Sequence, residues 1–151
     1  MCKWWEYVTK KEQDYSLFSA AADAGITMDQ MKALLTAQQG EEDAVYMYEQ
    51  LAKVVRDEAD RKAFVRLAGD EKRHSDVFKK YTCMDVKANP SKGILVPLMY
   101  RTLGKKKVYP IIAQGEYDAA EKYKHIIDDF PEVVEVMNDE VHHGDAVKGL
   151  L

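Results

Sequence analysis

The sequence predicts an all-α fold built as a bundle of four long helices. Apolar residues recur three and four positions apart over most of the chain, and no strand-type alternation of apolar and polar residues is sustained. The chain also carries one pattern twice. Residues 39–44 and 114–119 are identical at five of six positions, and residues 70–74 and 139–143 share their Asp, Glu and final His in the same order. We therefore expect two copies of one helix pair.

Residues 1–26 are expected to form a short N-terminal helical segment that precedes the bundle at residues 27–151. Trp4 and Trp5 are too apolar for a solvated tail, and large aromatic side chains mostly bury their area. Gly25 is a residue type that commonly ends a helix. We expect this segment to pack on the bundle or on a partner subunit.

The first two long helices are expected at about 27–56 and 59–81. Thr27 followed by Gln30 has the form of a capping box, in which each side chain accepts a hydrogen bond from the other residue's backbone N–H. A short acidic stretch separates the two helices, and acidic residues there favour the N-terminus of the second one.

The third long helix is expected after a connection at 82–93, which contains an Asn-Pro-Ser turn signal and divides the two halves of the chain. This connection is a candidate crossover. Gly104 and Pro110 interrupt the apolar pattern that follows, so the helix begins somewhere between 94 and 110 and covers at least 111–127.

The fourth long helix is expected from about 131 to 148. The Asp-Asp-Phe-Pro sequence before it marks a boundary, with Asp129 as a candidate cap and Pro131 near the first helical position.

The composition is that of a soluble globular chain. Of the 151 residues 46% are hydrophobic and 32% are charged, with a net charge of −4. No basic face dominates, which argues against nucleic acid as a partner. No uncharged apolar run approaches the roughly 18 residues that span a membrane. Cys2 and Cys83 fit neither a metal motif nor a disulfide framework, which favours a reducing, cytoplasmic location.

The repeated pattern supplies a set of candidate metal ligands. In each copy, one helix carries a Glu and the next carries Glu-x-x-His, whose two side chains share one face of a helix. These pairs lie on the apolar face, where an unpaired carboxylate is costly. The predicted ligands, which would also form the catalytic site, are Glu41, Glu71, His74, Glu116, Glu140 and His143.

Four carboxylates and two imidazoles suit two metal ions. This donor set favours iron or manganese over thiolate-preferring metals, and two ions about 3.5–4 Å apart need bridging ligands such as carboxylates. A chance cluster of charges is the alternative, and the matched repeat argues against it. His142 competes with His143, but the repeat alignment selects His143. His125 has no counterpart and is expected at the surface.

Two other pairs of matched positions, which are not candidate ligands, lie close to the glutamates. Tyr48 and Tyr123 each follow their glutamate by two helical turns, so they either donate hydrogen bonds to ligand carboxylates or pack in the core. Gly40 and Gly115 directly precede their glutamates. These glycines either permit close approach of the helices or are accidental.

At these residues the chain resembles the ferritin-like di-iron superfamily and, within it, rubrerythrin. The resemblance covers residues from about 28 to 148 and is carried by the Gln-Gly-Glu phrases and both Glu-x-x-His pairs. It implies a ferritin-like four-helix bundle with a di-iron centre held by the six ligands. It also implies reduction of hydrogen peroxide or dioxygen, and a homodimer that sometimes exchanges helices. Manganese or a mixed pair of metals is the alternative to iron.

The sequence departs from rubrerythrin in two ways. Rubrerythrins usually carry a C-terminal rubredoxin domain whose four cysteines hold an electron-transferring iron, and those cysteines are not found here, so an external electron donor such as rubredoxin is expected. Rubrerythrins also usually have a further Glu three residues after the position of Glu116, where this chain has Ala119. That substitution puts inheritance of the peroxidase activity in question.

Two other functions stay open at this stage. One is ferroxidase or iron-handling activity, as in other ferritin-like proteins, with iron as the substrate. The other is a helical bundle that uses metal for stability alone.

Overall fold

The computed structural model describes Ser19 and residues 21–151, and this part of the chain is all-α, as predicted. Its long helices are α2 (Met28–Val54), α3 (Glu58–Thr82), α4 (Ser91–Leu103), α5 (Lys105–Tyr123) and α6 (Val133–Lys148). Most of the predicted N-terminal segment lies outside the described residues. Residues 21–24 are helical, and Gly25 follows them with a φ of 68°. None of the described helices is long and apolar enough to cross a membrane.

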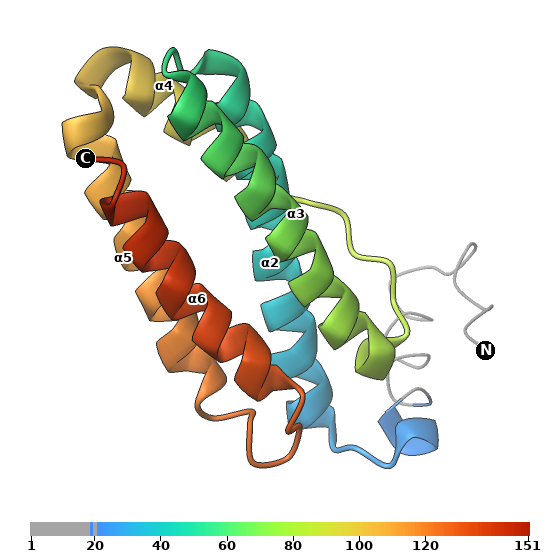
Figure 1. Ribbon diagram of the computed structural model, residues 1–151. Coiled ribbons are helices and arrows are strands. Elements are labelled where there is room, and N and C mark those ends of the chain that lie inside the picture. The colour runs from blue at the N-terminus through green and yellow to red at the C-terminus, as the bar shows by residue number, and fades with distance from the viewer. Residues whose placement is uncertain (1–18, 20) are drawn as a thin grey trace.

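Each copy of the repeated pattern forms one helix pair. α2 packs against α3 and α5 packs against α6, and Figure 1 shows the two pairs side by side with α4 across one end. α4 contacts α2 extensively and α5 less so, while the pairs also meet through α3 and α6. The connection predicted at 82–93 is shorter than expected because α4 begins at Ser91.

The starts of α2 and α3 follow from side chains next to them in the sequence. The Thr27 hydroxyl accepts a hydrogen bond from the Gln30 backbone N–H at 3.1 Å, and the Gln30 side chain accepts one from the Thr27 N–H at 2.7 Å. The predicted capping box is therefore confirmed. Asp57 caps α3 by accepting from the N–H groups of Ala59 and Asp60.

The start of α6 differs from the prediction. The helix begins at Val133, two residues after Pro131, and Asp129 does not cap it. The Asp129 carboxylate instead accepts a hydrogen bond from the Gln30 side-chain amide at 2.8 Å, which ties the loop before α6 to the start of α2. A contact between distant residues thus outcompetes the local cap.

The start of α5 is fixed by Gly104, which separates it from α4 with a φ of 75°. This conformation is readily accessible to glycine alone among common residues. α5 then continues through Pro110 and ends at Tyr123, four residues before the predicted limit, because residues 124–129 form turns.

The buried apolar side chains form two clusters, one toward each end of the bundle. The first includes Met47, Tyr48, Leu51, Phe64, Leu67, Tyr109, Ile112 and Val147. The second includes Leu34, Ala37, Phe78, Tyr123, Ile126, Phe130, Val133 and Val136. In each of the four long helices of the two pairs, the predicted ligands lie between residues of one cluster and residues of the other. The polar site therefore sits at mid-length of the bundle.

Candidate metal centre

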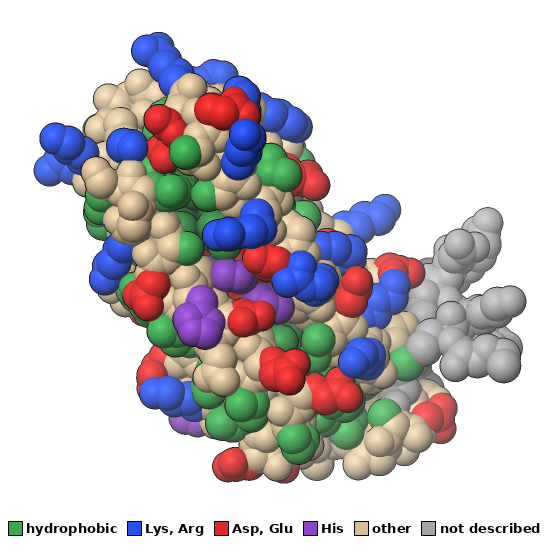
Figure 2. Space-filling view, in the orientation of Figure 1, with side chains coloured by type: hydrophobic (Ala, Val, Ile, Leu, Met, Phe, Trp, Pro, Cys, Tyr) green, Lys and Arg blue, Asp and Glu red, His purple; other side chains and the backbone are tan. Residues whose placement is uncertain are grey.

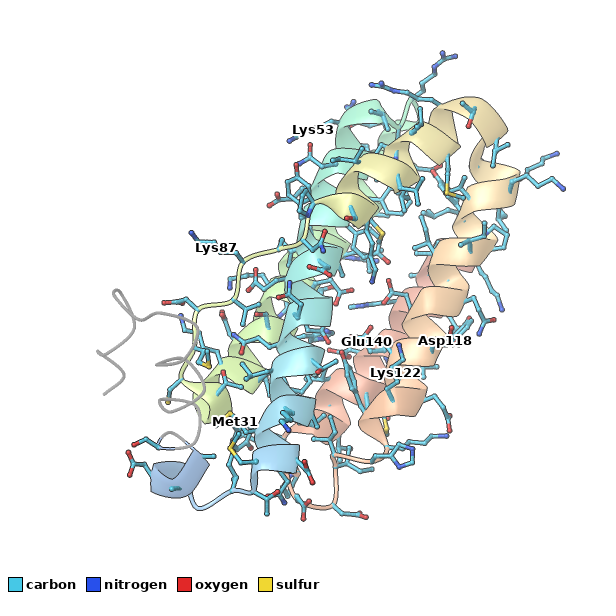
Figure 3. The ribbon with its side chains drawn as sticks, turned by 180° about the vertical axis from the view of Figure 1, so that it is seen from behind. Met31, Lys53, Lys87, Asp118, Lys122 and Glu140 are labelled. Atoms are coloured by element: carbon cyan, nitrogen blue, oxygen red, sulfur yellow. The ribbon has the colours of Figure 1, made fainter. Side chains whose placement is uncertain are left out.

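The six predicted ligands lie together in the interior, on α2, α3, α5 and α6. Each is at most 6% exposed. Figure 3 shows Glu140 at mid-length of the bundle, between the two helix pairs. On the face where α3 and α6 run side by side, Figure 2 shows histidine and acidic side chains gathered midway along the bundle. Helical spacing brings the residues of each helix to one face, and docking of the pairs brings the faces together.

The histidines of one copy face the glutamates of the other. His74 Nδ1 lies 2.8 Å from Glu140 Oε1, and His143 Nδ1 lies 2.9 Å from Glu71 Oε1. The two imidazole rings stack with centroids 5.2 Å apart. One ligand atom from each of these four residues lies within 4.8 Å of the others, close enough to bind a shared metal site.

Two aspartates that the sequence analysis did not assign to the site lie on the far side of these rings. Asp139 Oδ2 lies 3.3 Å from His74 Nε2, and Asp70 Oδ2 lies 3.6 Å from His143 Nε2. An ionised carboxylate only accepts hydrogen bonds, so Asp139 favours a proton on His74 Nε2 and leaves Nδ1 as the atom that would bind a metal in place of its own proton.

The signal for these aspartates is present in the sequence, because Asp70 and Asp139 directly precede the glutamate of each Glu-x-x-His pair. The contacts cross between copies, however. They arise only when α3 and α6 dock, which the spacing within one helix does not reveal.

The two tyrosines also cross between copies. The Tyr48 hydroxyl donates to Glu116, and the Tyr123 hydroxyl donates to Glu41. Burial, followed by the charge of the nearby glutamate, raises the pKa of both phenols, so they stay protonated at neutral pH. Each tyrosine therefore orients one glutamate of the opposite helix pair.

The crowding of buried carboxylates shifts their acidity in the metal-free protein. Burial, reinforced by the charge of Glu41, raises the pKa of Glu140 to about 11. Burial, opposed by His74 and reinforced by Glu41, raises the pKa of Glu71 well above its usual range. Burial lowers the pKa of His74, but the adjacent carboxylates outweigh it and raise that pKa overall. Burial lowers the pKa of His143. The carboxylates thus favour positive charge on His74, whereas burial disfavours it on His143.

The donor set fits bound metal. Among the described residues, three fully buried polar atoms make no hydrogen bond of good geometry: Glu71 Oε2, His74 Nδ1 and Glu140 Oε1. His74 Nδ1 lies 2.8 Å from Glu140 Oε1, but the two groups are not aligned for a hydrogen bond. Buried polar atoms are rarely left unpaired, and all three belong to the cluster. Metal ions would satisfy them, since carboxylate oxygen and imidazole nitrogen are ordinary ligands of iron and manganese.

The remaining candidates lie outside the cluster. The His142 side chain is 75% exposed and its Nδ1 lies 3.8 Å from Asp139, and His125 is also exposed. The idea that Gly40 and Gly115 permit close helix approach is wrong, because a Cβ added at either would meet nothing within 4 Å.

Comparison with known proteins agrees with this geometry. The family model for rubrerythrin matches residues 32–151. The chain belongs to the rubrerythrin family. Searches of curated proteins and of solved structures found no match. The rubrerythrin match spans both helix pairs, so it includes the buried Glu/His cluster of a metal site.

Proposed function

We propose that this rubrerythrin-family chain is an oxidoreductase that reduces hydrogen peroxide, or dioxygen, at a di-iron centre. Electrons would come from an external donor such as rubredoxin. The observation that carries the proposal is the buried cluster, in which each Nδ1 lies within 3 Å of a glutamate of the other copy and three polar atoms make no well-aligned hydrogen bond.

The geometry supports distinct roles for the six ligands. Glu71 lies 3.4 Å from His74 Nδ1 and 2.9 Å from His143 Nδ1, so it reaches both halves of the site and would help to hold metal in each. Glu140 stands in the matching position of the second copy. Glu41 and Glu116 each accept a tyrosine hydroxyl and would hold one ion each.

Peroxide reduction needs two electrons and two protons for each peroxide converted to two waters. Two ferrous ions, when bound, supply both electrons and thereby avoid release of a radical. The chain's own part is to fix the ligands and to cover both ends of the site. Asp139 hydrogen-bonds the His74 imidazole and Asp70 faces the His143 imidazole. Tyr48 and Tyr123 donate to ligand carboxylates, and the apolar clusters cover both ends of the site.

Ala119 affects whether the metal ions can move when the site is oxidised and reduced. It is half-buried and lines the cavity beside the cluster, where rubrerythrins usually have another glutamate. A methyl group cannot ligate metal, so we propose that the six ligands keep the ions in place through the redox cycle.

A stopped-flow titration tests the proposal. Fe(II)-loaded protein is expected to consume about one peroxide per di-iron site and then stop, because two electrons reduce one peroxide. Added rubredoxin, with its reductase and a reductant, is expected to sustain turnover. His74→Ala and His143→Ala should abolish the burst, whereas the exposed control His142→Ala should keep it.

Ferroxidase activity is the rival reading of the same cluster. It requires excess Fe(II) alone to sustain turnover, with ferric product leaving the site. That outcome, together with no peroxide turnover on adding rubredoxin, would refute the peroxidase proposal. Metal binding without either activity would leave only a structural role for the metals.

A further inference from the structure

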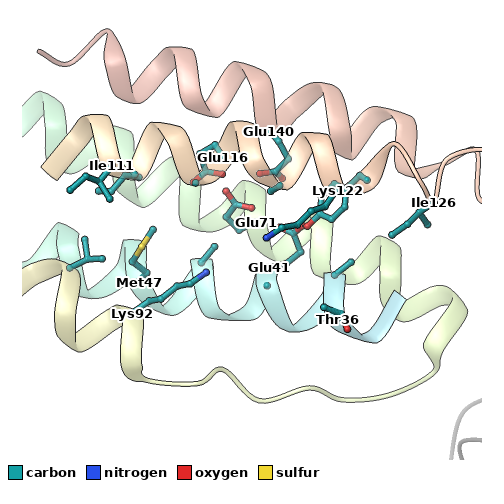
Figure 4. Close-up of a pocket in the computed structure, with 18 of the residues that line it drawn as sticks. Thr36, Glu41, Met47, Glu71, Lys92, Ile111, Glu116, Lys122, Ile126 and Glu140 are labelled. Carbon is teal, nitrogen blue, oxygen red and sulfur yellow. The ribbon is translucent and has the colours of Figure 1, made fainter. Parts of the chain in front are cut away.

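A groove separates the two helix pairs on the side opposite the α3–α6 contact. It has a volume of about 670 Å³ and lies between α2 and α5, with α4 along one edge. Figure 4 shows that it reaches the carboxylates of Glu41, Glu71, Glu116 and Glu140. This volume falls within the range of small-molecule sites, about 300–1,000 Å³.

The walls of the groove are mainly apolar. Met47 and Ile112 are buried in them, while Leu95 on α4 and Ile111 on α5 are each 55% exposed. Large apolar side chains are costly to leave in water, and when they gather on a concave surface they mark a binding site.

Two glycines keep the groove wide above the carboxylates. Gly40 on α2 and Gly115 on α5 both line it, and a Cβ at either would meet nothing within 4 Å. Glycine destabilises a helix relative to alanine, and packing does not require it at these two positions. Because glycine has no side chain, its presence in both copies leaves open space over the ligand glutamates.

The edges of the groove carry positive charge. Lys32, Lys92 and Lys122 line it from α2, α4 and α5, and in the described part of the chain none of them forms an ion pair. Figure 4 shows Lys92 and Lys122 extending toward its centre from α4 and α5. The acidic residues that line the groove are the buried ligand glutamates, which a bound metal would neutralise.

We propose that this groove binds a single-chain amphiphilic carboxylate. Its hydrocarbon chain lies on the apolar walls, and its carboxylate pairs with the lysines. The lysines favour this ligand over a purely apolar one, because none of the three forms an ion pair in the described part of the chain and an anionic head group would supply that partner. The ligand class is therefore an elongated anion with one apolar tail.

Calorimetric titration of the full chain, purified with its metals bound, tests the proposal with three probes below their micelle concentrations. Decanoate offers both tail and anionic head, acetate offers the head alone, and decyltrimethylammonium offers the same tail with a cationic head. Decanoate is expected to bind at one site per chain, at least tenfold more tightly than either other probe. Equal binding of acetate would show that the metals alone take the carboxylate, and would overturn the proposal.

Two pairs of variants locate the site. Gly115→Leu fills the groove and should weaken decanoate binding at least tenfold, whereas Gly69→Leu, at another helical glycine with open space around it and outside the groove, should leave it unchanged. The double variant Lys92→Glu/Lys122→Glu should weaken binding by about tenfold. Lys107→Glu, an exposed lysine outside the groove, should have no effect.

Two results would contradict the proposal. In the first, Gly115→Leu and Gly69→Leu bind decanoate equally, so that the groove is not the site. In the second, the wild-type chain binds no decanoate and forms a dimer that Gly115→Leu dissociates in sedimentation measurements. The groove would then be covered by a second copy of the chain.

Discussion

At the scale of single residues, the site is held by contacts that cross between the two copies of the repeated pattern. Sequence spacing could predict the candidate ligands, because a helix fixes the relation between Glu71 and His74 regardless of the rest of the fold. It could not predict that Asp139 holds His74, since that contact depends on how α6 docks on α3. The matched residues therefore predicted which side chains form the site. Which side chain of the other copy each one contacts depends on how the helices pack.

The aspartates should tune metal affinity without binding metal. Asp139→Asn can no longer hold the His74 ring as a charged acceptor, so metal affinity should fall by about 10–100-fold. Asp70→Asn should act in the same way on His143. Competition with a coloured chelator measures the affinity. Asp76→Asn, an exposed residue paired with Lys72, is the control, and an effect as large in this control would argue against the assigned role.

The tyrosine hydroxyls should contribute to stability. Tyr48→Phe leaves Glu116 buried without its donor, which should lower the free energy of unfolding by about 1–3 kcal/mol. Tyr117→Phe removes a hydroxyl that donates to Asp145 at the surface and should cost less, because water can replace the lost partner there. Urea denaturation of metal-free protein gives both values. If both variants lose the same free energy of unfolding, then burial of the Tyr48–Glu116 hydrogen bond does not increase its contribution to stability.

At the scale of helices, the sequence predicted a helix end correctly where the capping side chain is close in sequence and has no competing partner elsewhere in the fold. Thr27 and Gln30 satisfy each other three residues apart, so the start of α2 follows from sequence. Asp129 is predicted to cap α6, yet the helix begins only at Val133 and Asp129 accepts a hydrogen bond from Gln30 instead. Capping cannot be predicted from neighbouring sequence when the candidate side chain bonds to a residue far away in the chain.

Glycines in different helices should respond oppositely to alanine. A Cβ at Gly93 would lie 2.3 Å from the Tyr46 ring, so Gly93→Ala should force α4 away from α2 and cost about 1–3 kcal/mol. Gly115→Ala meets open space and should stabilise α5 by about 1 kcal/mol. Thermal and urea unfolding measure both. Destabilisation by Gly115→Ala would show that α5 packs more closely than the structure indicates.

At the scale of the whole molecule, a charged centre lies between two apolar clusters, with a groove along one side. Repetition in the sequence could predict two helix pairs and a shared site. It could not predict the groove, because the separation of α2 from α5 depends on the docking of α3 with α6 and on the placement of α4.

Stability of the metal-free protein should fall as the pH rises from 7 to 9. The pKa of Glu140 is about 11 in the folded chain and about 4.3 when unfolded, so the folded state keeps a proton that the unfolded state has released. The raised pKa values of Glu71 and His74 act in the same direction. This stability is complete below the unfolded pKa and is lost progressively above it, by about 1.4 kcal/mol per pH unit for each proton.

Metal-loaded protein should lack this loss, because bound metal replaces the protons on the carboxylates. Urea denaturation at pH 7, 8 and 9, with metal and with chelator, measures the difference. If the metal-free protein gains stability over this range, the buried carboxylates are already ionised and the account of the site's electrostatics is wrong.

The central claim is that the two copies of the pattern meet to hold two metals. A crystal structure with anomalous diffraction at the iron edge, from protein loaded with Fe(II), tests it most directly. We predict two anomalous peaks about 3.5–4 Å apart, contacting the side chains of Glu41, Glu71, His74, Glu116, Glu140 and His143. Absence of peaks within this cluster, or peaks bound by other residues, would contradict the claim.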